Sequence, residues 1–246
     1  MDLKDRVTLI TGGARIGEAV AKALADRGSH LILTYRTSKE SAEKSAKYTR
    51  SKGREALTLK TDLTLNQDLA DIIPKVRSKF GRLDVLINMA SLYEPTPLKG
   101  ADLKRWNHDI DANLKHAYSL SLDAASLMKK KGGGRIINFS DWTAGSGRPR
   151  YKGLMPYYVA KAGVAALTEV LALELAPDIL VNTIAPGPIL PPATGISESE
   201  KKEIVQNTPL KRWGGALEIA KAVLFLIESD FVTGECIRVD GGRHLY

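Results

Sequence analysis

Short runs of branched apolar residues recur along the chain, and longer amphipathic stretches separate them. Each run has four to six residues, which suits a strand and is too short for a helix across a core. The pattern therefore predicts seven strands, at residues 7–10, 31–35, 56–60, 85–88, 135–139, 179–184 and 235–239.

The stretches between these runs have helical periodicity. Leu69, Ile72 and Val76, for example, recur at intervals of three and four residues, which places them on one side of a helix. Strands that are apolar throughout are buried on both faces, and helical crossovers make neighbouring strands parallel. We therefore predict an α/β fold, with one doubly wound, seven-stranded parallel sheet and helices on both faces.

Composition narrows the setting of this fold. The 246 residues, 43% of them hydrophobic, suffice for one large core, and no linker divides the chain, so we predict a single domain over residues 1–246. Cys236 is the only cysteine, and no histidine has a partner at metal-ligand spacing, so neither disulfides nor a metal are expected. The chain starts with charged residues, and no apolar run approaches the ~20 residues of a membrane span. We expect a cytoplasmic protein without a membrane contact.

The net charge of +8 raises the question of nucleic acid binding. The lysines and arginines are spread through helical segments such as residues 39–52 rather than gathered in one block. We interpret them mostly as solvated helix faces, with local anion binding inside the fold. A small-molecule substrate is therefore expected, and nucleic acid is not.

The segment LITGGARIGEAVAKAL, residues 9–24, passes from strand to helix through a glycine-rich turn. Backbone amides at such a helix start can face a diphosphate, helped by the helix dipole. A tight turn without a ligand would need the same glycines, so the turn alone does not decide between the two. If it binds a dinucleotide, the residues in contact are Gly12, Arg15, Ile16 and Gly17.

The end of the second predicted strand bears on the choice of cofactor. About 20 residues past the turn, where a carboxylate would bind the ribose hydroxyls of NAD, the sequence has Tyr35, Arg36, Thr37 and Ser38. A 2′-phosphate would be repelled by a carboxylate here and bound by Arg36, Ser38 and Arg15. These arginines could equally face solvent, but the pattern favours NADPH over NADH.

Tyr157 and Lys161 stand four residues apart in a predicted helix and so share a face. Tyrosine has an ordinary pKa of about 10, and an ammonium within ~4 to 6 Å favours the phenolate. The pair is therefore a candidate proton donor for reduction of a carbonyl or an imine. The same spacing occurs by chance in many helices, so the interpretation depends on context.

That context is an ordered set of motifs. The TG-rich turn, TDLT at 61–64, NMAS at 88–91, the asparagine of DANLKHAYSL, the strand end NFSD, YxxxK at 157–161 and NTIAPGP at 182–188 follow one another as in the short-chain dehydrogenases/reductases. The resemblance covers the whole chain, down to the final VTGECIRVDGG. It implies one Rossmann-type domain, an NADP-dependent oxidoreductase and a homotetramer.

The resemblance also implies roles for individual residues. Asn113 would hold a water in a proton relay, and Tyr157 would be the acid. Lys161 would bind the nicotinamide ribose and lower the pKa of Tyr157. The residues implied to line the cofactor are Asp62 and Leu63 beside the adenine, then Asn88, Ala90 and Ser91, and finally Pro186, Gly187 and Ile189 near the carboxamide.

The sequence departs from the family pattern in two places. The glycine motif TGxxxGxG has eight positions, whereas Thr11 to Gly17 has seven and lacks the middle glycine. Asp141 stands where the family normally has its catalytic serine, and Ser140 comes one residue early. Successive strand residues point to opposite faces, so these two cannot both point into one site unless the strand has ended.

An aspartate at this place, with an arginine-containing turn, resembles the pteridine reductases within the family. In those enzymes an aromatic residue of the substrate loop stacks on the pterin, and Tyr93 in ASLYEPTPLKG matches it. The resemblance implies that Asp141 works with Tyr157 through water to protonate a ring nitrogen, while hydride from NADPH reaches the adjacent carbon. Ser91 and Trp213 complete the candidate substrate contacts.

Several alternatives stay open on the sequence. Asp141 could instead be a solvated loop carboxylate that pairs with Arg148 or Arg150. The enzyme could be a general carbonyl or 3-oxoacyl thioester (3-oxoacyl-acyl-carrier-protein type) reductase, or the chain could be a non-catalytic NADP(H)-sensing protein, which the shortened turn would favour. A further hypothesis is that Arg243 reaches the site of a neighbouring subunit.

Overall fold

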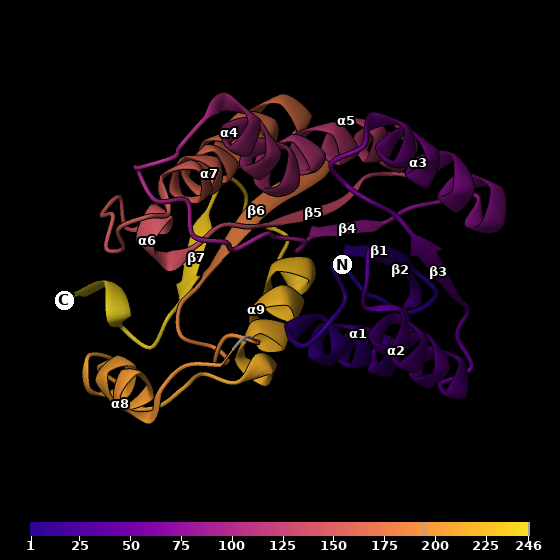
Figure 1. Ribbon diagram of the computed structural model, residues 1–246. Helices are drawn as coiled ribbons and strands as arrows, with labels where there is room; N and C mark the ends of the chain where they lie inside the picture. Colours follow the sequence, from indigo (N-terminus) through magenta and orange to yellow (C-terminus); the bar gives the residue numbers. More distant parts are fainter. Residues whose placement is uncertain (194, 246) are drawn as a thin grey trace.

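The centre of the computed structural model, which describes residues 1–193 and 195–245, is one parallel sheet (Figure 1). The strand order is β3-β2-β1-β4-β5-β6-β7, so the chain reverses its direction of winding between β1 and β4. This confirms the predicted doubly wound α/β fold, with each strand within two residues of its predicted bounds. The strands are β1 (Val7–Thr11), β2 (His30–Tyr35), β3 (Ala56–Lys60), β4 (Val85–Asn88), β5 (Gly134–Phe139), β6 (Ile179–Pro186) and β7 (Cys236–Val239).

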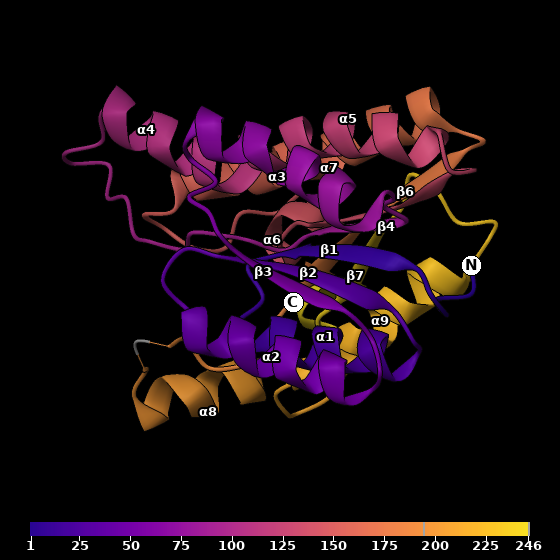
Figure 2. The ribbon, with the colours of Figure 1, turned by 90° about the vertical axis from the view of Figure 1, so that its right-hand side faces the viewer.

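Helices cover both faces of the sheet (Figure 2). One face carries α3 (Asn66–Phe80), α4 (Leu103–Ile110), α5 (His116–Lys129) and α7 (Met155–Leu175). The other carries α1 (Ile16–Asp26), α2 (Lys39–Ser51) and α9 (Ala216–Glu228). Shorter elements are α6 (Trp142–Gly145), α8 (Glu198–Gln206), a π-helical turn (Asp111–Lys115) between α4 and α5, and a 3-10 turn (Arg243–Leu245). None of the helices within the described ranges is long and apolar enough to cross a membrane.

Successive residues of the central strands serve two different cores. In β1, Leu9 packs among residues of α3, α5 and α7, whereas Ile10 packs among residues of α1 and α9. Both side chains are fully buried, and burial of such a side chain stabilises the fold by about 1.5–3 kcal/mol. This alternation explains why apolar residues occupy successive positions in the strands and not only every second one.

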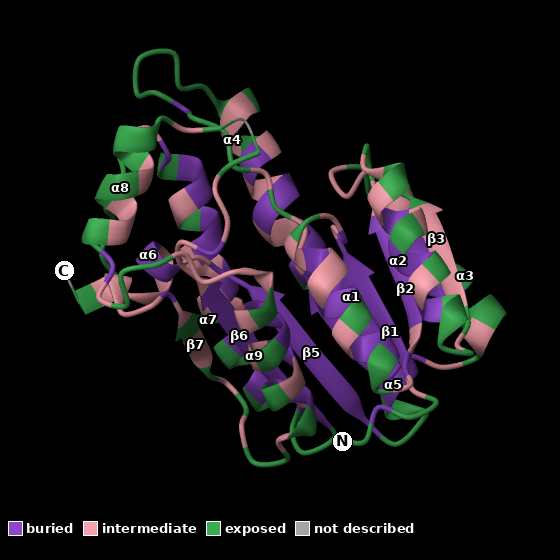
Figure 3. Ribbon diagram, turned by 90° about the horizontal axis from the view of Figure 1, so that it is seen from below, coloured by how far each residue is buried: buried purple, intermediate pink, exposed green. Residues whose placement is uncertain are grey.

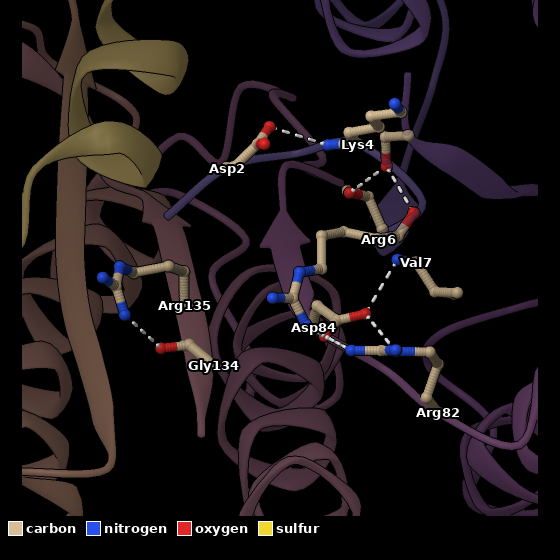
Figure 4. A network of polar contacts seen from close by, with 10 residues as sticks. Asp2, Lys4, Arg6, Val7, Arg82, Asp84, Gly134 and Arg135 are labelled. Atoms are coloured by element: carbon tan, nitrogen blue, oxygen red, sulfur yellow. Dashed lines mark hydrogen bonds and ion pairs between the residues drawn. The ribbon is translucent and has the colours of Figure 1, made fainter. Parts of the chain in front are cut away.

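The two ends of the strands differ in what surrounds them. The N-terminus lies at the amino ends, whereas α8 and the longer loops lie where the strands end (Figure 3). The amino ends hold a polar network around Asp84, which joins β4 to β1 (Figure 4). The residues singled out in the sequence follow the carboxyl ends, where ligands bind in sheets of this kind.

Candidate active site

The glycine turn is held against the end of β4. The side-chain oxygen of Thr11 accepts hydrogen bonds from the backbone amides of Met89 and Ala90, at 3.0 and 3.1 Å. Gly12 has a φ of +70°, and a Cβ there would lie 2.7 Å from the Cα of Ala90. Any other residue at position 12 would push the turn away from β4.

The shortened motif places α1 directly after the turn. Arg15, the N-cap of α1, has a φ of +53°, a conformation that costs about 1–3 kcal/mol for a residue other than glycine. Its side chain forms no capping bond, and its guanidinium contacts the carbonyl of Pro191 in the loop after β6. The Gly17 amide donates to the Ala14 carbonyl at 3.0 Å, but no side chain caps the first turn. The first turn of α1, which begins at Ile16, is therefore suited to bind an anion.

The segment after β2 offers a cation and a hydroxyl. Tyr35 ends the strand and packs on the core, while Arg36 and Thr37 are exposed. Arg36 has no carboxylate within ion-pair distance in the part of the chain that is described. Ser38 is the N-cap of α2, yet its side chain makes no capping bond. This donor set fits a ribose 2′-phosphate beside the anion site of α1.

Asp62 and Leu63 follow β3 on the same edge of the sheet. Burial raises the pKa of Asp62, but hydrogen bonds from Thr64 and the charge of Arg36 together hold it below its ordinary value. Asp62 accepts from the Thr64 amide and hydroxyl at 3.0 and 2.7 Å. Leu63 packs against the core beneath α3. The carboxylate therefore shapes the turn and stays ionised near Arg36.

Asn88 lies in a buried ladder that crosses the sheet. Its amide nitrogen donates to the side-chain oxygens of Asn138 and Ser121, at 2.9 and 3.3 Å. The Oδ1 of Asn88 is buried and has no hydrogen-bond partner among the residues described. The ladder holds the end of β4 rigid, so that Ala90 and Ser91 have a fixed place beside the glycine turn.

Asn113 sits in the π-helical turn between α4 and α5. Its side-chain oxygen accepts from the Ser91 hydroxyl at 2.8 Å and from the Leu92 amide at 2.9 Å. Its amide nitrogen donates to the Asp109 carbonyl at 3.0 Å. The π-helical turn thus points Asn113 at the loop after β4. The hydrophobic periodicity of the sequence does not predict such a turn, because a π-helical turn inserts only one extra residue into a helix.

Asp141 and Tyr157 meet at the end of β5. Asp141 is the N-cap of α6, and its Oδ1 accepts from the Thr143 amide and hydroxyl at 2.8 and 2.6 Å. Its Oδ2 faces the Tyr157 hydroxyl at 3.2 Å. The alternative in which Asp141 pairs with Arg148 or Arg150 is wrong for this structure, because the carboxylate is engaged by Thr143 and Tyr157.

The pKa of Tyr157 is shifted upward, whereas the sequence predicts that the Lys161 ammonium shifts it downward. Burial, and then the neighbouring Asp141 carboxylate, raise the pKa of Tyr157 well above 10. Burial lowers the pKa of Lys161 to about 8, against a raising effect of Asp141. The Lys161 ammonium donates to the Phe139 carbonyl at 2.8 Å. Burial and Asp141 therefore set the direction of the shift and Tyr157 keeps its proton, while a lowering of its pKa by Lys161 stays a prediction.

Ser140 points away from Asp141, as expected for neighbours at a strand end. Its hydroxyl is buried and donates to the Lys161 carbonyl at 2.7 Å, which ties β5 to α7. The hydroxyl of Ser140 therefore has a structural partner. Asp141, not Ser140, reaches the position beside Tyr157.

A small pocket opens next to these two side chains. Tyr93 covers Tyr157 edge-on, with the ring centroids 5.0 Å apart, and Tyr93 itself is half exposed. The loop that carries Tyr93 is joined to the segment before α7 by a 2.6 Å hydrogen bond from the Thr96 amide to the Gly153 carbonyl. The pocket is lined by Tyr93, Asp141, Thr143, Arg150, Tyr151, Leu154, Tyr157 and Tyr158.

Other expected residues lie near this pocket or apart from it. Trp213 is half-buried between α8 and α9 and does not line it. Pro186 is the last residue of β6, and the amide of the next residue, Gly187, donates to the Val239 carbonyl at 2.9 Å. Ile189 is buried in the core, so only its backbone is free to approach a ligand.

Arg243 stacks on its own subunit. Its guanidinium lies 5.7 Å from the centre of the Trp142 ring, which also packs edge-on against Tyr151 at 6.1 Å. Within one chain Arg243 therefore supports the wall of the pocket, and its reach toward a neighbouring subunit stays a prediction. Sequence reasoning missed Thr143, Tyr151 and Leu154, since nothing in their spacing distinguishes them from ordinary loop residues.

Comparison with known proteins agrees with this geometry. A family model described as enoyl-(acyl carrier protein) reductase matches residues 13–244. The 3-oxoacyl-[acyl-carrier-protein] reductase FabG of Escherichia coli K12 is 34% identical, with all of both chains covered. FabG of Staphylococcus epidermidis is 32% identical over 98% of this chain and 100% of its own.

Solved structures extend the comparison to three dimensions. A short-chain dehydrogenase/reductase from Serratia marcescens superposes with a TM-score of 0.91 at 28% identity, covering 99% of this chain and 100% of its own. FolM alternative dihydrofolate reductase 1 from Brucella canis, complexed with NADP, gives 0.89 at 28% identity, covering 100% and 97%. With the sheet order, the Tyr157 and Lys161 pair and these matches together, the chain belongs to the short-chain dehydrogenase/reductase family of oxidoreductases.

Proposed function

We propose that the protein uses NADPH to reduce a C=N bond of a pterin or dihydrofolate-like substrate. The observation that carries the proposal is the hydrogen bond between Asp141 and Tyr157 at 3.2 Å. The carboxyl group occupies a position where the family normally has a serine. It can pair with a ring nitrogen and an exocyclic amine of the substrate together, as a serine hydroxyl cannot.

The chain's own residues would divide the work as follows. NADPH, when bound, supplies hydride. Tyr157 holds the transferable proton, and its raised pKa keeps that proton in place at neutral pH, which suits a reductase. Asp141 orients the heterocycle and shares the proton path with Tyr157. Lys161 would contact the nicotinamide ribose, and Asn113 would fix the loop that carries Ser91 beside the reacting atoms.

The preference for NADPH rests on the segment after β2. Arg36 and the uncapped hydroxyl of Ser38 suit a 2′-phosphate, and no carboxylate stands where NAD enzymes bind the ribose hydroxyls. The similar FolM structure is complexed with NADP. The diphosphate would lie at Gly12, Arg15, Ile16 and Gly17. Arg15 could also turn from the Pro191 carbonyl toward a phosphate.

The remaining cofactor contacts are proposed along the same NADPH site. Tyr35 and Thr37 flank Arg36, and Ala90 and Ser91 follow β4. The other residues proposed to line the cofactor are Asp62, Leu63, Asn88, Pro186, Gly187 and Ile189. For the substrate we propose Ser91, Tyr93, Asp141 and Tyr157. Trp213 would join them only if the segment after α8 moves toward the pocket.

A 3-oxoacyl thioester reductase is the second candidate. It is favoured by the curated relatives, because the FabG proteins of Escherichia coli and Staphylococcus epidermidis align over nearly the whole chain. In this alternative Asp141 substitutes for serine and only accepts a hydrogen bond from Tyr157. A non-catalytic NADP(H) sensor has less support, because the chain keeps Tyr157, Lys161 and Asn113 together.

The test is a substrate comparison with the purified protein. NADPH oxidation is followed by absorbance with dihydrobiopterin and with an acetoacetyl thioester, and kcat/KM is compared. We expect the pterin to be the better substrate. Equal or reversed values would reject the pterin proposal, and NADPH binding without turnover of any carbonyl or imine would favour the sensor.

We also propose that the protein is a homotetramer, as the family resemblance implies. Exposed apolar side chains on α5 and α7, including Leu122, Val170 and Leu173, are available for subunit contacts. Light scattering of the purified protein measures its mass directly. A mass of one chain would contradict this proposal.

A further inference from the structure

A group of exposed cations lies in the segment that contributes Arg150 to the pocket of Asp141 and Tyr157. Arg148, Arg150 and Lys152 are exposed in the segment between α6 and α7. None of the three has a carboxylate within 4.0 Å in residues 1–193 and 195–245. The sequence from 142 to 168 contains no aspartate or glutamate. This rim of the pocket, which we call the cationic rim, is therefore positively charged.

A neighbouring arginine on the same side of the pocket loop, Arg105, is neutralised within the chain. Arg105 in α4 pairs with Glu94 at 2.8 Å and with the buried Asp109 at 2.9 Å. Arg105 therefore has its anion within the chain, whereas the cationic rim does not. Cations that lie close together without a counter-ion repel one another, and binding of an external anion relieves this repulsion. The difference marks the rim as a place for a ligand's negative charge.

The cationic rim is anchored where it can meet a substrate. Arg150 lines the same pocket as Asp141 and Tyr157. The backbone on its C-terminal side is fixed by Tyr151, which packs on Trp142, and by the hydrogen bond from the Thr96 amide to the Gly153 carbonyl. The exposed Arg150 therefore stands at the mouth of the pocket and the half-buried Asp141 inside it, with Arg148 and Lys152 two residues before and after Arg150 in the chain.

We propose that the cationic rim binds the carboxylate of a substrate tail that extends out of the pocket. This rests on the proposed pterin reduction and narrows it. The substrate is a pterin-type ring joined to a carboxylate-bearing tail, as in dihydrofolate, rather than a pterin with a neutral side chain. Asp141 repels an anionic tail from the interior, and Arg150 attracts it at the mouth. The opposed charges therefore orient the substrate with its ring inward.

The experiment compares two substrates that share the ring. We measure kcat/KM for dihydrofolate and for dihydrobiopterin, whose side chain is uncharged, and take their ratio. Arg150→Gln is expected to lower the ratio about fivefold, since an exposed ion pair contributes up to about 1 kcal/mol. The triple variant Arg148→Gln/Arg150→Gln/Lys152→Gln is expected to lower it at least about tenfold.

Two controls separate charge recognition from damage to the fold. Arg77→Gln makes the same chemical change at an exposed arginine of α3, and it should leave the ratio unchanged. For the wild type, the ratio should fall as ionic strength rises from about 0.05 to about 0.5 M, because salt screens exposed charges. Continued turnover of dihydrobiopterin shows that the variants are folded.

The outcomes separate this inference from the proposed function. If both pterins are reduced but the ratio does not respond to the variants or to salt, the inference is overturned and the proposed function stands. If neither pterin is reduced, both fail. If the triple variant instead lowers activity only with thioesters on an acidic carrier protein, the rim serves a protein partner and the inference is overturned.

Discussion

Asp84 and Asp141 are both aspartates beside a strand end, but Asp84 precedes β4 at the amino ends of the strands, whereas Asp141 follows β5 at the carboxyl ends. Asp84 is 1% exposed, and its oxygens accept from Arg82 at 2.6 and 2.9 Å, from Arg6 at 3.2 Å and from the Val7 amide at 2.9 Å (Figure 4). Asp141 is half-buried and faces two hydroxyls, of Thr143 and Tyr157, and one amide.

The difference shows how the two ends of one sheet are used. At the amino ends each hydrogen-bonding position of the carboxylate is filled by a cation or an amide of the chain, which stabilises the junction of β1 and β4. At the carboxyl ends the carboxylate and the nearby cations are kept apart, with Asp141 inside the pocket and Arg150 at its mouth. Charges without ionic partners at the carboxyl ends indicate a functional site, whereas the fully paired charges at the amino ends indicate a structural contact.

The largest effect is expected at the carboxyl ends. Tyr157→Phe removes the transferable proton, so kcat should fall by about 10³-fold, while NADPH affinity stays nearly unchanged. Stopped-flow or steady-state kinetics with a fluorescence titration of NADPH measure both quantities. Retained turnover would mean that another group is the acid.

The next effect separates the two aspartates. Asp84→Asn leaves Arg82 and Arg6 without their buried anion, and it should lower the free energy of unfolding by about 3 kcal/mol. Asp141→Asn keeps the N-cap of α6, because asparagine caps as well as aspartate, and should change stability by less than about 1 kcal/mol. Urea unfolding of both variants tests this. Equal losses of stability would remove the distinction between the two ends.

A smaller effect concerns the cofactor. Arg36→Asp replaces the proposed phosphate contact with a repelling charge, so the ratio of NADPH to NADH affinity should fall by about tenfold or more. Titration with each cofactor gives the ratio. An unchanged ratio would show that Arg36 faces solvent only.

The pH dependence sharpens the role of Lys161. Its pKa is lowered to about 8 by burial, so the ammonium is present below that value and lost above it. We expect kcat/KM to decline as pH rises through about 8, by up to about tenfold per unit. Tyr157 keeps its proton through this range, because its pKa is raised well above 10. A flat profile to pH 9 would mean that the charge of Lys161 is not needed.

The sequence predicts the fold because two cores require apolar residues at successive strand positions, as Leu9 and Ile10 show in β1. It predicts the pairing of positions 141 and 157 only through resemblance, since the end of β5 decides which neighbour points inward. The upward shift of the pKa of Tyr157 does not follow from the spacing of Tyr157 and Lys161, because burial and then the Asp141 carboxylate cause it. Arg243 and Trp142 come together only through the return of the C-terminal segment across the sheet edge.

The most direct measurement of the central claim is the specificity of Asp141→Ser. Serine is the residue that the family normally has here, and it preserves the cap of α6. With NADPH, kcat/KM for dihydropterins should fall by about tenfold or more, while kcat/KM for an acetoacetyl thioester should hold or rise. If the pterin activity is unchanged, or if both activities fall equally, Asp141 does not select the heterocycle and the account is contradicted.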